Sequence, residues 1–220
     1  MRRIVFIDIA KAICIMLVVV GHYVPDGSPG WYVAVHDVIY TFHMPLFMFA
    51  SGYVYMATRK DVPYGGFLLK KARRLMVPYL ATSAIVITIK LLSQGGLSVD
   101  NPVTPLSYLK MLYRPEAGAF LWFIWALWWM FVVVSLLRTK AARLAFFLAA
   151  LALHYIPLPL PDVFCLAQCK SMLAYFMLGV VVCEHRALRG FAAGLRPARA
   201  AAAVAVFAVA QACWLAFGGG

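Results

Sequence analysis

Long apolar runs, separated by short polar segments, dominate this chain of 220 residues. A helix needs about 20 predominantly apolar residues to cross the hydrocarbon core of a bilayer. The pattern predicts an all-α, polytopic transmembrane helix bundle of about seven spans, because only helices and closed barrels satisfy their backbone groups in lipid. The expected spans are Ile4–Val24, Val38–Ala57, Leu75–Leu92, Ala119–Leu137, Leu144–Ile156, Met172–Cys183 and Arg199–Phe217.

The composition supports a lipid-facing surface. Hydrophobic residues make up 65% of the chain and charged residues 13%, against roughly 45–50% and about 25% in soluble domains. The net charge of +12 suggests nucleic acid at first, but the basic residues lie in short clusters between apolar runs. That placement is typical of a membrane protein held in one orientation. We therefore expect the lipid bilayer as a partner and no nucleic acid.

The basic residues also predict the topology. With the N-terminus in the cytoplasm, fifteen Lys and Arg residues fall in inside segments, and only Lys110, Arg114 and Lys170 fall in outside segments. Such an excess marks the cytoplasmic side. The first run contains Asp8 and Lys11 and has no small-residue cleavage site after it, so we expect a retained span and not a signal peptide.

The first span carries three residues that are unusual in lipid. A charge at the bilayer centre costs about 2.5–3.5 kcal/mol on insertion scales, so a functional role is the default. Asp8 and Lys11 are three residues apart and can pair on one helix face. His22 follows Lys11 by eleven residues, within about 20° of three full turns and about 16 Å further along the axis. The alternatives are a snorkelling pair for Asp8 and Lys11 and an ordinary interfacial histidine for His22.

The second span holds the segment FHMPLFMFASGY, residues 42–53. His43 lies inside an apolar stretch, and Pro45 is expected to kink the helix. Ser51 and Gly52 offer a small surface for close helix approach. The alternative is a kinked packing helix whose histidine is hydrogen-bonded to a neighbour.

The third span is preceded by the basic segment KKARRLMVPY, residues 70–79. Its simplest role is to set the topology, but several bases at the cytoplasmic mouth of a bundle also suit a phosphate-bearing ligand. Cys165 and Cys169 share one loop, and whether they pair stays open. Their spacing is not that of a zinc site, and we expect no metal.

Taken in order and spacing, these segments resemble the acyltransferase-3 family of membrane O-acyltransferases. The matching pieces are IDIAKAICIMLVVVGH, FHMPLFMFASGY and KKARRLMVPY, with LWFIWAL (residues 121–127) and YFMLGVV (residues 175–181) as weaker echoes. The resemblance covers about residues 4–185. The family more often has arginine where this chain has Lys11, which keeps the charge but loses the planar fork.

The resemblance implies an enzyme that transfers an acyl group, commonly acetyl, from cytoplasmic acyl-CoA to a hydroxyl of a sugar, surface glycan or glycolipid. It implies no bound cofactor beyond the acyl-CoA (acetyl-CoA) substrate, and a multi-pass location in the plasma (inner) membrane of a bacterium. The residues expected to act are His22 as general base with Asp8 orienting Lys11, Lys11, Lys71, Arg73 and Arg74 at the donor phosphates, and His43 and Ser51 lining the channel.

Family members usually carry about ten spans, against about seven expected here from the run lengths. We expect residues 1–220 to form a single membrane-embedded domain that is incomplete at its C-terminus. Two other classes stay open. A small-solute or proton-coupled transporter would use the intramembrane charges and histidines as a path, although no inverted repeat is evident. An inactive membrane fragment or partner subunit is the third class.

Overall fold

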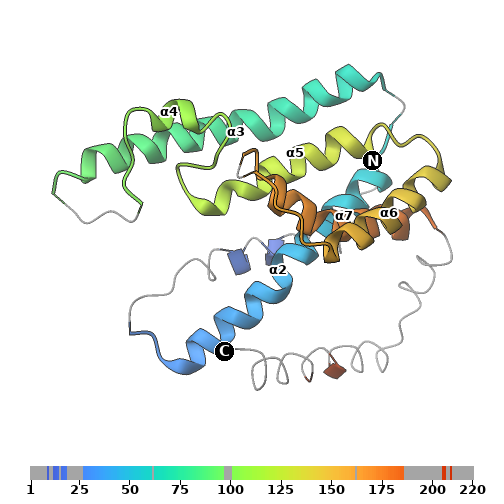
Figure 1. Ribbon diagram of the computed structural model, residues 1–220, viewed down its shortest axis with the longest axis horizontal. Helices are drawn as coiled ribbons and strands as arrows, with labels where there is room; N and C mark the ends of the chain where they lie inside the picture. Colours follow the sequence, from blue (N-terminus) through green and yellow to red (C-terminus); the bar gives the residue numbers. More distant parts are fainter. Residues whose placement is uncertain are drawn as a thin grey trace. The chain divides into compact units, whose positions relative to one another are not determined.

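The structure is a computed structural model, and it describes residues 9, 12–14, 16–18, 27–60, 62–96, 101–161, 163–185, 205, 206 and 209. Every regular element in these ranges is a helix, which confirms the all-α prediction (Figure 1). The elements are α2 (Gly30–Ala57), α3 (Tyr64–Ser93), α4 (Ser107–Lys110), the 3-10 helix η1 (Ala119–Leu121), α5 (Trp122–Val134), α6 (Lys140–Tyr155) and α7 (Leu166–Glu184).

Three of these helices, α2, α3 and α7, are long and apolar enough to cross a membrane. Helix α5 is apolar but has only 13 residues, and α6 has 16. The expected spans Ile4–Val24 and Arg199–Phe217 lie mainly outside the described residues, although residues 12–14 and 16–18 are helical. The count of about seven spans therefore stays a prediction based on run length.

The chain divides into two compact units. Unit 1 comprises Met1–Thr58 and Leu178–Gly220, and thus contains α2 and the C-terminal part of α7. Unit 2 comprises Arg59–Met177, and contains α3 to α6 and the first part of α7.

Helix α3 begins well before the predicted span. The apolar run starts at Leu75, but the helix starts at Tyr64, directly after Pro63. At 1.5 Å per residue its 30 residues span about 45 Å, roughly 15 Å more than the hydrocarbon core. The basic segment, residues 70–79, is therefore helical.

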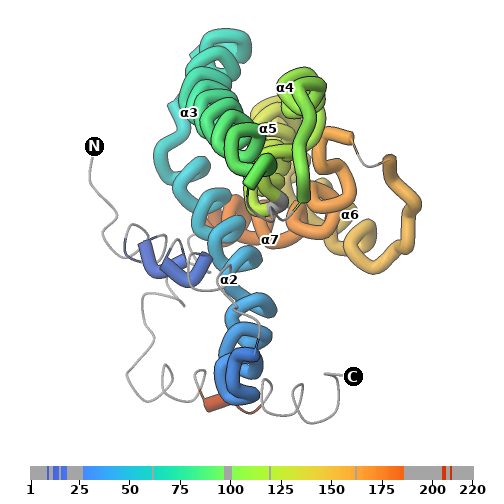
Figure 2. Tube along the Cα trace, turned by 90° about the vertical axis from the view of Figure 1, so that its left-hand side faces the viewer, coloured from blue at the N-terminus to red at the C-terminus, as the bar shows by residue number. Residues whose placement is uncertain are grey.

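In unit 2, α3 and α5 pack side by side in opposite directions (Figures 1 and 2). Near one end, the Tyr64 hydroxyl donates to the carbonyl of Val132 at 3.3 Å. Further along, the rings of Tyr79 and Trp125 meet edge to face, with centroids 5.8 Å apart. Such aromatic pairs add about 0.5–1.5 kcal/mol beyond their buried area. The surrounding core consists of Tyr79, Ile87, Val103, Ala117, Leu121, Trp125 and Cys165.

The loop at residues 101–118 is fastened to α3 by side chains that bond its backbone. Tyr79, which is fully buried, donates through its hydroxyl to the carbonyls of Met111 (2.7 Å) and Arg114 (3.0 Å). The amide of Gln94 donates to the Val103 carbonyl at 3.0 Å and accepts from the Val103 N–H at 2.6 Å. Buried backbone groups need such partners, so the loop is a packed layer on α3.

Two further contacts hold the rest of unit 2. Arg143 is 4% exposed and donates to the carbonyls of Leu137 (2.6 Å) and Arg138 (3.0 Å). Arg143 therefore closes the turn between α5 and α6. The predicted topology counts it only as a basic residue that marks the cytoplasmic side. His154 on α6 donates through Nδ1 to the Ser171 carbonyl on α7 at 2.8 Å.

The cysteines that the structure describes, Cys14, Cys165, Cys169 and Cys183, form no disulfide. The N–H of Cys169 instead donates to the carbonyl of Cys165 at 2.9 Å, the i,i+4 bond of a helix beginning. In the described part of the chain, no group of three or more His, Cys, Asp or Glu side chains is placed to hold a metal ion.

Candidate functional site

The three residues predicted on the first span, Asp8, Lys11 and His22, lie outside the described residues. Their pairing and vertical alignment therefore stay predictions from helical geometry. The other predicted residues fall on two helices: His43 and Ser51 on α2 in unit 1, and Lys71, Arg73 and Arg74 on α3 in unit 2.

His43 is buried in α2 with only 3% of its surface exposed. Its Nδ1 lies 2.7 Å from the carbonyl of Ile39. A carbonyl only accepts, so the proton of the ring must be on Nδ1, which leaves Nε2 as the acceptor of a neutral imidazole. This tautomer suits a buried group that receives a hydrogen bond from a substrate or from a neighbouring side chain.

Ser51 lies two turns further along α2 and is equally buried. Its Oγ has no hydrogen-bond partner among the described residues. Because an unsatisfied buried hydroxyl costs about 1–3 kcal/mol, this atom is a candidate donor to a group absent here. Helix α7 passes close to the neighbouring turn of α2: a Cβ on Gly179 would lie 2.1 Å from the Phe49 carbonyl oxygen.

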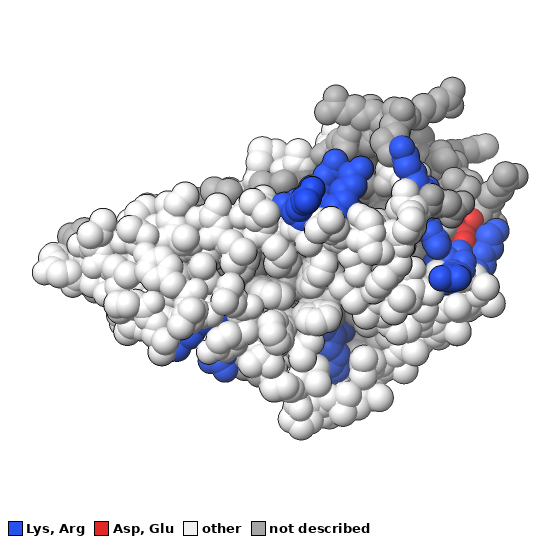
Figure 3. Space-filling model, turned by 90° about the horizontal axis from the view of Figure 1, so that it is seen from above, with Lys and Arg blue, Asp and Glu red and all other residues white. Residues whose placement is uncertain are grey.

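The first three turns of α3 carry a concentrated basic face. Lys70, Arg73 and Arg74 are exposed, and together with Gly66 and Leu69 they line an open depression of about 390 Å³. These five positions follow the i, i+3, i+4, i+7, i+8 spacing of one helix face. Figure 3 shows that Lys and Arg gather in a few clusters, one of them beside an acidic side chain, on a surface that is mostly uncharged.

The electrostatics of this basic face favour an anion. Lys70, Arg73 and Arg74 form no ion pair with a described residue. Arg73 and Arg74 lie nine and ten residues after Tyr64, where α3 begins, and thus beyond the first turn to which the effect of the helix dipole is confined. A phosphate at this place would therefore meet the charged side chains themselves.

Lys71 belongs to a different face of the same helix. Its Nζ lies 3.9 Å from the ring centroid of Phe131 on α5 and 5.6 Å from that of Phe67. A cation over an aromatic face gains about 0.5–2 kcal/mol, more where water is excluded. The α3 residues predicted to bind the acyl donor are thus on two faces: Arg73 and Arg74 line the depression, whereas Lys71 contacts Phe131 at the α3–α5 interface.

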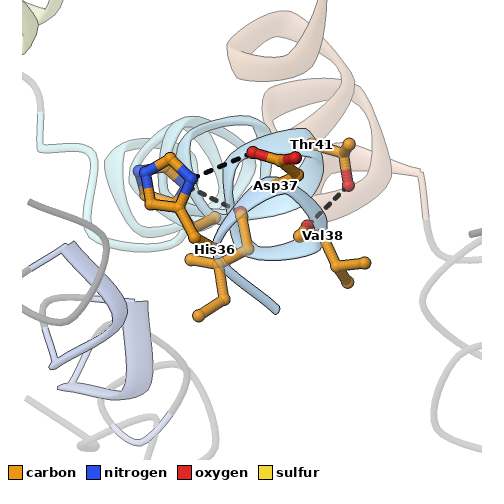
Figure 4. A network of polar contacts seen from close by, with 6 residues as sticks. His36, Asp37, Val38 and Thr41 are labelled. Carbon is orange, nitrogen blue, oxygen red and sulfur yellow. Dashed lines mark hydrogen bonds and ion pairs between the residues drawn. The ribbon is translucent and has the colours of Figure 1, made fainter. Parts of the chain in front are cut away.

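Sequence reasoning included Lys70 in the basic segment but did not assign it to the donor-binding residues. The helical spacing from Gly66 to Arg74 predicts that Lys70 shares a face with Arg73 and Arg74. This prediction is not available when the segment is treated as a loop. Sequence reasoning also missed His36 and Asp37, which are in contact on α2 (Figure 4). Their signal was the seven-residue spacing between His36 and His43, which places both imidazoles on one helix side.

Long apolar helices and an all-helical fold define a membrane protein, and the basic face of α3 is its candidate anion site. The chain belongs to the acyltransferase-3 family: the family model described as an acyltransferase domain matches residues 4–219.

Two curated proteins are similar to this chain in sequence. Nodulation protein NolL of Mesorhizobium japonicum is 30% identical over 163 residues, which cover 70% of this chain and 41% of that protein. Nodulation protein NolL of Sinorhizobium fredii is 32% identical over 145 residues, which cover 63% and 36%. The chain thus spans about two fifths of the length of these curated relatives. No solved structure matches it.

Proposed function

We propose that this protein transfers an acyl group, in the simplest case acetyl, from cytoplasmic acyl-CoA to a hydroxyl of a sugar or surface glycan across the bacterial inner membrane. Membership of the acyltransferase-3 family supports the reaction class. The observation that carries the donor assignment is the basic face of α3, where three cations that form no ion pair with a described residue line one depression.

Coenzyme A carries several phosphate groups at one end and its thioester at the end of a long, thin arm. Arginine binds phosphate bidentately and lysine as a point charge, so Lys70, Arg73 and Arg74 suit the phosphate end. With the N-terminus in the cytoplasm, this part of α3 lies on the side where acyl-CoA is made.

In the proposed reaction the acceptor hydroxyl oxygen attacks the thioester carbonyl carbon, and the C–S bond breaks. His22 takes the hydroxyl proton as general base, because neutral imidazole titrates near the operating pH. The proton then passes to the leaving thiolate, so the products are an O-acyl ester and free CoA thiol. We assign Ser51, whose hydroxyl can donate, to polarisation of the thioester carbonyl during this step. We assign His43, whose Nε2 only accepts in this tautomer, to the lining of the channel.

The donor assignment is tested with labelled acetyl-CoA and membranes that contain the full chain. The double variant Arg73→Ala/Arg74→Ala is expected to raise the KM for acetyl-CoA by at least about tenfold, since a hydrogen bond to a charged group contributes about 1.5–3 kcal/mol. The matched control is Lys140→Ala, an exposed base on α6 that should leave KM unchanged. An unaltered KM in the double variant would contradict the donor assignment.

The catalytic assignment is tested on the first span. His22→Ala is expected to lower label transfer to glycan by about 10²-fold or more, the usual contribution of general-base catalysis. Lys11→Arg should retain much more activity than Lys11→Ala, because the donor end needs the charge. Immunoblots of the membrane fraction check that each variant is inserted. Full activity of His22→Ala would rule out His22 as the base.

A further inference from the structure

The first turns of α2 carry polar and aromatic side chains that the proposed reaction has not used. His36, Tyr40 and His43 follow the i, i+4, i+7 spacing of one helix side. The ring centroids of His36 and Tyr40 lie 4.4 Å apart, and those of Tyr40 and His43 lie 5.0 Å apart. His36 is half-buried, Tyr40 is exposed and His43 is buried. We refer to His36, Asp37 and Tyr40 as the α2 stripe.

His36 and Asp37 form a pair within this stripe. The Nδ1 of His36 lies 3.0 Å from Oδ1 of Asp37 (Figure 4). A carboxylate only accepts, so Nδ1–H donates and Nε2 is left as the acceptor of the neutral ring. The side chains keep 24% and 41% of their surface exposed. The pair therefore offers an imidazole acceptor and a second carboxylate oxygen to a ligand.

The length of α2 places the stripe at the outer membrane surface. Its 28 residues extend about 42 Å, roughly 12 Å more than the hydrocarbon core. The basic residues Arg59 and Lys60 follow its C-terminus on the predicted cytoplasmic side, so the excess length lies at the N-terminal end. There Trp31 and Tyr32 meet edge to face at 5.7 Å, as amphipathic rings do at an interface.

We propose that the α2 stripe is the binding site for the saccharide acceptor, and that it holds a pair of sugar hydroxyls at the outer end of the helix. This inference rests on the proposed acyl transfer, of which it names the acceptor subsite. The Asp37 carboxylate accepts hydrogen bonds from hydroxyl donors, and such charge-assisted bonds are among the stronger ones. The Nε2 of His36 accepts a hydrogen bond from a further hydroxyl, and the π face of Tyr40 presents the negative side of the ring quadrupole to the C–H groups of the sugar.

The same groups fit a neutral, hydroxyl-rich ligand better than a cation. The charge of Asp37 is already engaged by the ring N–H of His36, and the described residues offer no third ligand for a metal. The Asp37 carboxylate is 41% exposed, and its contact with lipid at the membrane surface would cost free energy. A polar ligand or water must therefore meet it.

The test measures binding of methyl β-D-glucopyranoside to the full chain in lipid nanodiscs by saturation-transfer-difference NMR, without any acyl donor. Asp37→Asn and Tyr40→Leu are each expected to weaken glycoside binding by about tenfold. Tyr40→Phe retains the ring and should bind nearly as well as the wild type. The matched control is Thr58→Val at the opposite end of α2, which should have no effect. Size-exclusion elution verifies that each variant is folded.

Three outcomes would overturn the inference: no glycoside binding by the wild type, equal binding by Asp37→Asn and the wild type, or saturation of the site by Zn²⁺ in competition with the glycoside. In acyl-transfer assays the same two variants should raise the KM for the acceptor and leave the KM for acetyl-CoA unchanged. Stripe-dependent glycoside binding without acetyl transfer would overturn only the proposed function. Acetyl transfer with stripe-independent binding would overturn only the acceptor site.

Discussion

At the scale of single residues, neighbours in one sequence motif have different surroundings. Arg73 and Arg74 line an open depression, whereas Lys71 lies over the ring of Phe131. The sequence predicted a basic cluster correctly, because charge density is visible without a structure. It did not predict which bases share a face, because that depends on where the helix begins, and helix boundaries are poorly marked when no cap residue is present.

Gly179 gives the sharpest prediction at this scale. A Cβ there would lie 2.1 Å from the carbonyl oxygen of Phe49 and 2.8 Å from the N–H nitrogen of Tyr53, both part of the α2 backbone. Gly179→Ala is therefore expected to lower the free energy of unfolding by about 1–3 kcal/mol through overpacking, measured by thermal unfolding of the purified chain in detergent. The matched control is Gly65→Ala, where no atom lies within 4 Å. A Gly179→Ala protein as stable as the wild type would contradict the close crossing.

At the scale of elements, α2, α3 and α7 contain the predicted spans Val38–Ala57, Leu75–Leu92 and Met172–Cys183, and each helix begins earlier than its apolar run. Hydropathy identifies the apolar part of a helix, but it does not detect the polar helical turns that precede or follow that part. The attachment of the loop at residues 101–118 was not predicted, because it depends on contacts distant in sequence, such as Tyr79 to Met111.

Tyr79→Phe tests this attachment. The substitution keeps the ring against Trp125 but removes the hydroxyl that satisfies the carbonyls of Met111 and Arg114. Two acceptors lose their partner, so we expect a loss of about 1–3 kcal/mol in stability, visible as a lower Tm. Tyr155→Phe, on a side chain 78% exposed, is the control. Equal Tm values for the two variants would show that the hydroxyl bonds contribute nothing to stability.

At the scale of the whole molecule, composition and apolar run length were enough to predict an all-helical membrane protein, because lipid allows few alternatives. The three long apolar helices and the family match agree with that class. The predicted catalytic alignment of Lys11 with His22 lies outside the described residues, so it still rests on helical periodicity alone.

The topology predicts the outcome of reporter fusions. Alkaline phosphatase folds only outside the cytoplasm, since it needs disulfides. A fusion after Lys60, between α2 and α3, is expected to be inactive, and a fusion after Pro105, in the loop that follows α3, is expected to be active. The reverse pattern of activity would indicate the opposite orientation of the chain. In that orientation the basic face of α3 would lie on the side that lacks acyl-CoA.

Pro78 gives α3 one further property. It lies inside the helix, where its missing N–H leaves the carbonyl of Arg74 without its usual helical donor and lowers the cost of bending. On one side of Pro78 are the exposed bases Lys70, Arg73 and Arg74, and on the other is Tyr79, which bonds the loop at residues 101–118. The basic end of α3 can therefore bend at lower cost than an unbroken helix, while the loop contacts of the other end stay in place.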